Sequence, residues 1–108
     1  FDFFSAKMAE ECKNLITSLH NNDNSSFIID LTTVADIENN LGENLIALND
    51  IVYHEYNGSL VFTNLQEAVL KKLKQHQIHL SINITPTLIE AIDIISMEVL
   101  ERDLLDEQ

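Results

Sequence analysis

Hydrophobic positions along the chain alternate between helical and strand spacing. Residues 5–19 carry apolar side chains at intervals of three and four, which predicts a helix. A polar loop at 20–26 follows, and then residues 27–31 form a nearly continuous apolar run, typical of a strand covered on both faces. Helical spacing returns over residues 41–56. The pair Asn57-Gly58 is predicted to end this second helix, because glycine tolerates the left-handed conformation found at helix ends.

The second half of the chain repeats the alternation. Residues 59–63 read as another buried strand, and Asn64 is predicted to cap a third helix. Apolar and polar residues alternate over 78–84, which predicts a third strand with one more exposed face. A last helix is expected to begin at Thr85 or Thr87 and to run to about residue 105. The inward residues expected on these last two helices are Leu65, Ala68, Val69 and Leu73, followed by Leu88, Ala91, Ile92, Ile95, Val99 and Leu100.

Strands connected through helices pair in parallel with right-handed crossovers, so the order predicts an α/β fold with a mostly parallel sheet. The length of 108 residues suits one domain, residues 1–108, and the apolar content of 45% suffices for a core. Three parallel strands make a small sheet. We therefore expect that one or two strands preceding Phe1 would complete the sheet, and that its free edge could pair with a second copy to give a homodimer.

Charge excludes several partners. Eighteen acidic residues oppose six basic ones, a formal net charge of −12, which repels nucleic acid and anionic membranes. Lys71, Lys72 and Lys74 form a single basic cluster, interpreted as the solvated face of a helix. The sequence has no apolar run long enough to cross a bilayer, so no membrane insertion is expected. The only cysteine, Cys12, lies on an apolar stripe with Met8, Leu15 and Leu19; we expect burial and a cytoplasmic location.

Candidate catalytic groups do not form a recognisable motif. The histidines are not at metal-ligand spacing on one helix face, and a metal shared by His76 and His79 is a weak alternative to surface histidines. Glycine-rich phosphate loops and a nucleophile elbow are absent. Four acids near predicted strand ends could cluster at one edge of the sheet, although solvated loop acids are the default. These are Asp2, Asp30, Asp36 and Glu38.

Four segments in order resemble the STAS domain, the fold of anti-sigma-factor antagonists and of the cytoplasmic tails of sulfate transporters. The segments are residues 2–6, 27–42, 58–62 and 85–92, so the resemblance covers nearly the whole chain. In the antagonists, the turn after the first of the buried strands reads roughly Asp-Ser-Ser-Gly-Leu-Gly. A partner anti-sigma factor kinase phosphorylates a serine there, and the phosphate abolishes binding.

The resemblance implies that the corresponding turn of this chain contacts a protein partner. Its proposed partner-binding residues are Asp36, Glu38, Asn39, Asn40, Leu41 and Gly42. Glu38 takes the aspartate position, and Asn39 and Asn40 replace the phosphoacceptor, with the turn one residue short. The nearby hydroxyls, on Ser5, Thr32 and Thr33, do not match the acceptor position. The alternative is that Glu38 and Asn39 simply cap the following helix.

The lack of a catalytic motif favours a non-catalytic protein-binding module without cofactor or metal, and the resemblance implies a role in bacterial signal transduction and transcription control. The expected partner is an anti-sigma factor or serine kinase. Two alternatives stay open: a ligand-sensing or lipid-transport accessory domain of the same fold, and a metal-dependent hydrolase that uses Asp30, Asp36 and Glu38.

Overall fold

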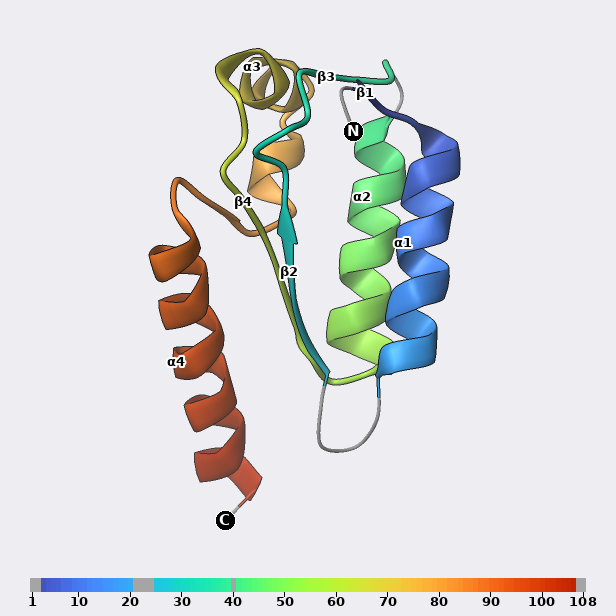
Figure 1. Ribbon diagram of the computed structural model, residues 1–108. Coiled ribbons are helices and arrows are strands. Elements are labelled where there is room, and N and C mark those ends of the chain that lie inside the picture. Colours follow the sequence, from blue (N-terminus) through green and yellow to red (C-terminus); the bar gives the residue numbers. More distant parts are fainter. Residues whose placement is uncertain (1–2, 21–24, 40, 107–108) are drawn as a thin grey trace.

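Five short strands and four α-helices make up the computed structural model, which describes residues 3–20, 25–39 and 41–106 (Figure 1). In chain order the elements are β1 (Phe3–Phe4), α1 (Ala6–Leu19), β2 (Ser26–Asp30), β3 (Asp36–Ile37), α2 (Leu41–Asp50), the π-helix η1 (Ile51–Glu55), β4 (Ser59–Thr63), α3 (Glu67–Gln75), the 3-10 helix η2 (Ile78–Leu80), β5 (Ile84–Thr85) and α4 (Leu88–Asp106). Among the described helices, none is both long and apolar enough to span a membrane.

The strands form two parallel sheets. The larger has the order β2-β4-β5, with Ser26 opposite Ser59 and Phe62 opposite Ile84. The smaller pairs β1 with β3, and Phe4 lies opposite Ile37. Parallel pairing through helical connections confirms the predicted α/β fold, while the two-residue strand β1 is an addition to it.

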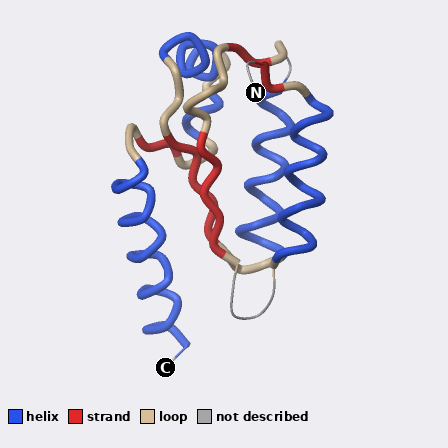
Figure 2. Tube along the Cα trace, viewed as in Figure 1, coloured by secondary structure: helices blue, strands red, loops and turns tan. Residues whose placement is uncertain are grey.

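Helices cover both faces of the larger sheet. Figures 1 and 2 show α1 and α2 side by side on one face, α4 on the other, and α3 across the end where β2 and β4 finish. Each residue of β4 has an exposed fraction of 0%, so this strand forms the centre of the core. The predicted second helix is confirmed with a modified end: α2 continues into η1, where Tyr56 N donates to Ile51 O in π-helical spacing.

Two predicted helix starts are confirmed and one is wrong. Ser5 Oγ accepts the N–H of Met8 at the start of α1, and Thr87 Oγ1 accepts the N–H of Glu90 at the start of α4. Asn64 does not cap α3. It adopts a left-handed conformation (φ 59°) three residues before the helix, and its amide donates to Asp30. Asn64 therefore serves the backbone turn after β4 and does not cap the helix.

The turn before β4 depends on Gly58, but not for the predicted reason. Asn57 is the left-handed residue (φ 50°), and the φ of Gly58 is not positive. A Cβ on Gly58 would lie 2.0 Å from the carbonyl oxygen of Ser25. The two backbone segments approach closely here, since the N–H of Ser59 donates to Ser25 O at 2.9 Å, and this approach requires a glycine at position 58.

The predicted third strand at 78–84 is confirmed as the edge strand β5, but its extent is wrong, because residues 78–83 are not in a strand. Gln77 is left-handed (φ 59°) and leads into η2, and only Ile84 and Thr85 pair with β4. Ile78 and Ile82 are buried, whereas Leu80 has an exposed fraction of 73%. Burial thus follows a spacing of four in this segment, and the alternation of apolar residues in the sequence is coincidental.

The predicted inner faces of three helices also need correction. On α1, Ala9 and Ile16 are buried and Cys12 is half-buried, while Leu15 and Leu19 are exposed. Burial, followed by the charge of Glu11, raises the pKa of the Cys12 thiol and so favours its protonated form. On α3, Val69 and Leu73 face inward as predicted, but Ala68 is exposed. On α4, Ala91 is buried, whereas the remaining predicted inward residues are only partly buried or exposed; these are Leu88, Ile92, Ile95, Val99 and Leu100.

A polar network connects α4 to the rest of the core. The hydroxyl of Tyr53 donates to Glu98 Oε1 at 2.8 Å and accepts from the amide of Asn83 at 2.5 Å. Burial, followed by the hydrogen bond to the Glu98 carboxylate, raises the pKa of Tyr53 to about 12. The network therefore favours the protonated phenol.

We predict that Gly58→Ala destabilises the protein by roughly 1–3 kcal/mol, because the new Cβ forces β2 and β4 apart at their first pair. Urea unfolding followed by circular dichroism measures the effect. Asn57→Gly is the matched control, since glycine adopts the left-handed conformation more readily, and we expect it to leave stability unchanged or slightly raised. Equal stabilities of Gly58→Ala and the parent chain would contradict the packing described here.

Tyr53→Phe should make stability less dependent on alkaline pH. The pKa of Tyr53 is higher in the folded chain than the ordinary value of 10.0, so its contribution is full below pH 10 and is lost as pH rises through about 12. The variant should be less stable by about 1 kcal/mol at pH 8. Urea midpoints of the parent chain and of Tyr53→Phe, measured at pH 8 and at pH 11.5, should differ less at the higher pH. A constant difference would mean that the phenol is not protected by this network.

Candidate functional site

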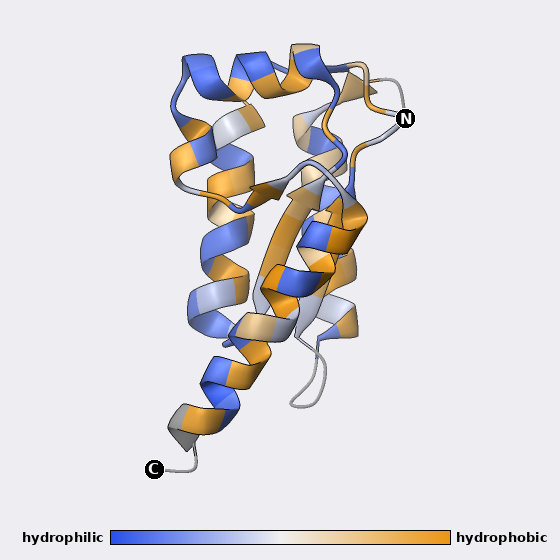
Figure 3. Cartoon of the chain, turned by 90° about the vertical axis from the view of Figure 1, so that its left-hand side faces the viewer, coloured by the Kyte–Doolittle hydropathy of each residue, from blue (hydrophilic) through white to orange (hydrophobic). Residues whose placement is uncertain are grey.

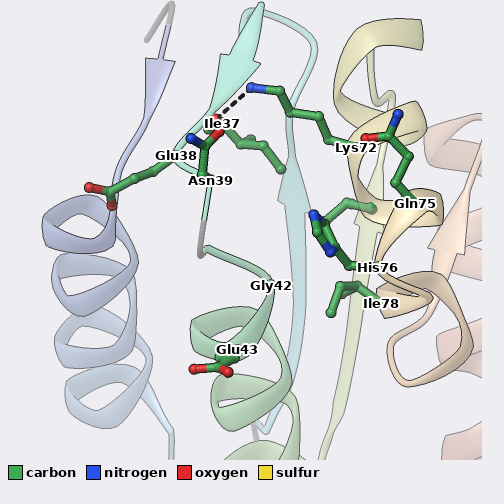
Figure 4. Close-up of a pocket in the computed structure, with 10 residues that line it drawn as sticks. Ile37, Glu38, Asn39, Gly42, Glu43, Lys72, Gln75, His76 and Ile78 are labelled. Carbon is green, nitrogen blue, oxygen red and sulfur yellow. Dashed lines mark hydrogen bonds between the residues drawn. The ribbon is translucent and has the colours of Figure 1, made fainter.

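The turn at residues 36–42 lies at the carboxyl ends of β2 and β4, the edge where parallel sheets commonly carry their binding sites. It leads from β3 into α2, and Figure 4 shows it beside α3. Pairing of β3 with β1 holds its first half, and the N–H of Glu38 extends this pairing by donating to Phe4 O at 2.9 Å. The turn is thus fixed by the smaller sheet.

Glu38 caps a helix, but a different one from the helix predicted. Its carboxylate points toward the start of α1 (Figure 4), and Oε2 accepts the N–H of Ala6 at 2.6 Å. The first N–H groups of a helix lack partners within the helix, and a negative charge there is favourable. Glu38, which the resemblance places at the aspartate of the antagonist turn, therefore links the turn to α1. Asn39 is exposed, and its side chain makes no capping bond to another residue within the described part of the chain.

An ion pair connects the turn to α3. Lys72 Nζ lies 2.6 Å from Asp36 Oδ1 and also donates to Ile37 O at 3.2 Å. The hydrogen bond from Lys72, followed by the bond from the N–H of Ile37, lowers the pKa of Asp36. Both side chains are well exposed, so the pair positions groups more than it stabilises the fold. The sequence indicated that Lys72 belongs to a solvated helix face. The structure corrects this, because Lys72 forms an ion pair with Asp36.

A cavity of about 310 Å³ opens between the turn, α2 and α3. Its apolar surface comes from Ile37, Leu73 and Ile78. Its polar lining is the set Glu38, Asn39, Glu43, Lys72, Gln75 and His76, most of which Figure 4 shows around the opening. Gly42 completes the lining, and a Cβ there would lie 2.6 Å from Ile78 Cδ1, so the glycine lets Ile78 pack against α2. The mixture of an apolar base and charged rim suits a side chain or short segment of another protein.

The predicted partner-binding residues have different positions around this cavity. Glu38, Asn39 and Gly42 line it, and Asp36 orients Lys72 at its edge. Leu41 has an exposed fraction of 1% and belongs to the core, so any contribution to a surface is indirect. Asn40 lies outside the described residues.

Five lining residues come from a part of the chain that sequence reasoning did not connect with the turn: Lys72, Leu73, Gln75, His76 and Ile78. They lie more than 30 residues further along. The basic cluster containing Lys72 was the one available signal, and the excess of acids elsewhere could have suggested that a lysine there has an acidic partner.

The acids proposed for a metal-dependent hydrolase are not brought together. Asp30 accepts hydrogen bonds from Thr32 and Asn64, and these lower its pKa. Asp36 pairs with Lys72 and Glu38 with α1. Asp2 lies outside the described residues. Within the described part of the chain, no three His, Cys, Asp or Glu side chains are placed to hold a metal ion.

A second groove, of about 530 Å³, lies between α3, β5 and α4. It is lined mostly by apolar residues such as Leu65, Leu70 and Ile94, together with His79. His76 lines the first cavity and His79 lines this groove, so the predicted alternative of a metal shared by these two histidines gains no support from either hollow. The ligand-sensing alternative needs a groove of this kind, and ligand binding stays a prediction.

We predict that Glu38→Ala lowers the stability of the chain by about 1 kcal/mol, because the first turn of α1 loses its carboxylate cap. Asn39→Ala, a neighbouring exposed position, should change stability by less than about 0.5 kcal/mol. Chemical unfolding of the two variants side by side measures the difference. The reverse order of stabilities would show that Glu38 is not the structural residue of the turn.

Comparisons with known proteins find a similar fold without a similar sequence. No family model matches the chain, and no curated protein matches it either. Among solved structures, the chain is similar to a candidate anti-sigma factor antagonist from Thermotoga maritima, with a TM-score of 0.72. The two share 14% sequence identity, and the match covers 88% of this chain and 82% of the other.

At that identity the comparison concerns the fold. It agrees with the order of strands and helices described above and with the predicted resemblance. The chain therefore has a STAS-like fold of the kind found in an anti-sigma factor antagonist.

Proposed function

We propose that this chain is a non-catalytic protein-binding module that acts as anti-sigma factor antagonists do. Its partner, an anti-sigma factor of the serine-kinase type, would contact the opening formed by residues 36–42 and α3. The observation that carries the proposal is the cavity beside the turn, because it combines an apolar base with charged residues from two elements. The fold shared with a candidate antagonist supports the same function.

The chemistry of the turn favours binding over catalysis. Its two carboxylates are already engaged, Asp36 with Lys72 and Glu38 with the N–H of Ala6. Neither forms the pair of carboxyl groups with different environments that acid and base catalysis requires. What the turn leaves available at the opening is Asn39, together with Glu43 and His76 on the adjacent helices. These are groups that hydrogen-bond to a partner.

The proposal also includes the loss of phosphate control. In antagonists of this family, a phosphate on the turn adds charge and bulk where the partner packs. Asn39 and Asn40 have no hydroxyl that could accept a phosphoryl group. Binding at this turn would then be constitutive, or it would be regulated at another position.

We expect Asn39→Asp to weaken partner binding at least tenfold, because a charge at the exposed rim imitates part of the effect of a phosphate. Isothermal titration with the anti-sigma factor encoded in the same genome measures the affinity. Asn14→Asp is the matched control: the same change at an exposed position in the middle of α1 should leave the affinity unchanged.

A kinase assay with the same partner and ATP completes the test. The parent chain should incorporate no phosphate, whereas Asn39→Ser or Asn40→Ser should restore an acceptor. Phosphate found on a serine or threonine of the parent chain, with loss of binding, would overturn the constitutive part of the proposal. Equal affinities of Asn39→Asp and Asn14→Asp would overturn the binding site.

A further inference from the structure

Helix α4 has polar residues on its side toward the sheet and many large apolar residues exposed to solvent, the reverse of the usual arrangement of a surface helix. Its side toward the sheet carries Glu98, bonded to the Tyr53 hydroxyl, and Arg102, whose Nη1 donates to Gly58 O at 3.2 Å. Ala91 is the fully buried contact on that side. Hydrogen bonds of polar side chains therefore connect much of this helix to the sheet, and most of its large apolar side chains are exposed.

Seven of the eleven exposed large apolar side chains in the described residues lie on α4. They are Leu88, Ile89, Ile92, Met97, Val99, Leu100 and Leu104. Figure 3, which turns α4 toward the viewer, shows apolar segments recurring along that face. Ile89, Met97, Leu100 and Leu104 fall on one stripe at helical spacing, interrupted by Asp93, and we call these four residues the α4 stripe. A helix that is apolar on its outer side as well is ordinarily covered.

The charges around the α4 stripe limit what can cover it. Its exposed ionisable neighbours on the helix are all acids: Glu90, Asp93, Glu101 and Asp103. Arg102, the single cation of α4, is bonded to Gly58 O. A second copy of the chain would bring these acids against their own equivalents, and an anionic lipid surface would be repelled by the net charge of −12. A partner with apolar residues flanked by Lys or Arg is complementary in both respects.

We propose that the α4 stripe is a docking surface for an amphipathic helix of a different protein, with an apolar face flanked by basic residues. The stripe extends from Ile89 to Leu104, a span of 16 residues, so it would accommodate about four turns of a helix packed alongside α4. Helix α4 covers the face of the sheet opposite α1 and α2, away from the turn at residues 36–42 (Figure 1). The two surfaces can therefore be occupied at the same time, and the docking surface does not depend on the function proposed for the turn.

The test uses three synthetic 18-residue helical peptides. The first has leucines along one face and lysines beside them. The second has serines in place of the leucines, and the third has glutamates in place of the lysines. Fluorescence anisotropy should show binding of the first peptide, weakened by salt, and at least tenfold weaker binding of the other two.

The variant Ile89→Ser/Leu100→Ser should reduce affinity for the first peptide at least tenfold. Both side chains are largely exposed, so the fold should persist, and circular dichroism checks this. The matched control is Leu15→Ser/Leu80→Ser, which removes two equally exposed leucines from other elements and should leave the affinity unchanged.

Three outcomes would overturn the proposal. One is equal binding of the lysine–serine peptide, which would mean that charge alone is recognised. Another is equal affinity of the two double variants for the first peptide. The third is a dimer of the parent chain in light scattering that Ile89→Ser/Leu100→Ser converts to a monomer, since a second copy would then be the occupant.

Discussion

Strand β4 is completely buried, and the other elements are arranged around it. It pairs with β2 on one side and β5 on the other, while helices cover both faces of the sheet. The beginning of β4 is set by Gly58, where β2 approaches too closely for any side chain. The end of β4 leads through residues 64–66 into α3, which forms one wall of the cavity; the turn at residues 36–42 lies on another side of it.

The site depends on two connections between elements distant in sequence. Glu38 ties the turn to the first N–H of α1, and Asp36 ties it to Lys72 of α3. Both connections use carboxylates. Asp36 and Glu38, which were candidates for a catalytic pair, each hold a different neighbouring element at the edge of the cavity. The remaining polar groups at the opening are available for recognition, which agrees with a binding module of STAS-like fold.

Sequence patterns were informative where periodicity reflected burial. The run at 59–63 and the spacing of Leu41, Leu45 and Leu48 correspond to buried residues, because strands and helices in a core must present an apolar face. The pattern misled at 78–84, where alternation suggested a strand but Ile78 and Ile82 are buried at a spacing of four. It misled again on α4, whose inward side includes Glu98 and Arg102. Periodicity alone cannot show that a glutamate has Tyr53 as a buried partner.

For the candidate site, the sequence predicted the turn, which stays a prediction as a binding surface. It did not predict the side of the cavity contributed by α3, since the contact of Lys72 with Asp36 arises from tertiary packing. The central claim is that a protein partner binds at this junction. Amide chemical shifts of the labelled chain, recorded with and without the anti-sigma factor from the same genome, test it most directly. The account predicts the largest changes at Ile37, Asn39, Gly42, Glu43, Lys72 and His76. Changes confined to other surfaces of the chain, with these amides unaffected, would contradict it.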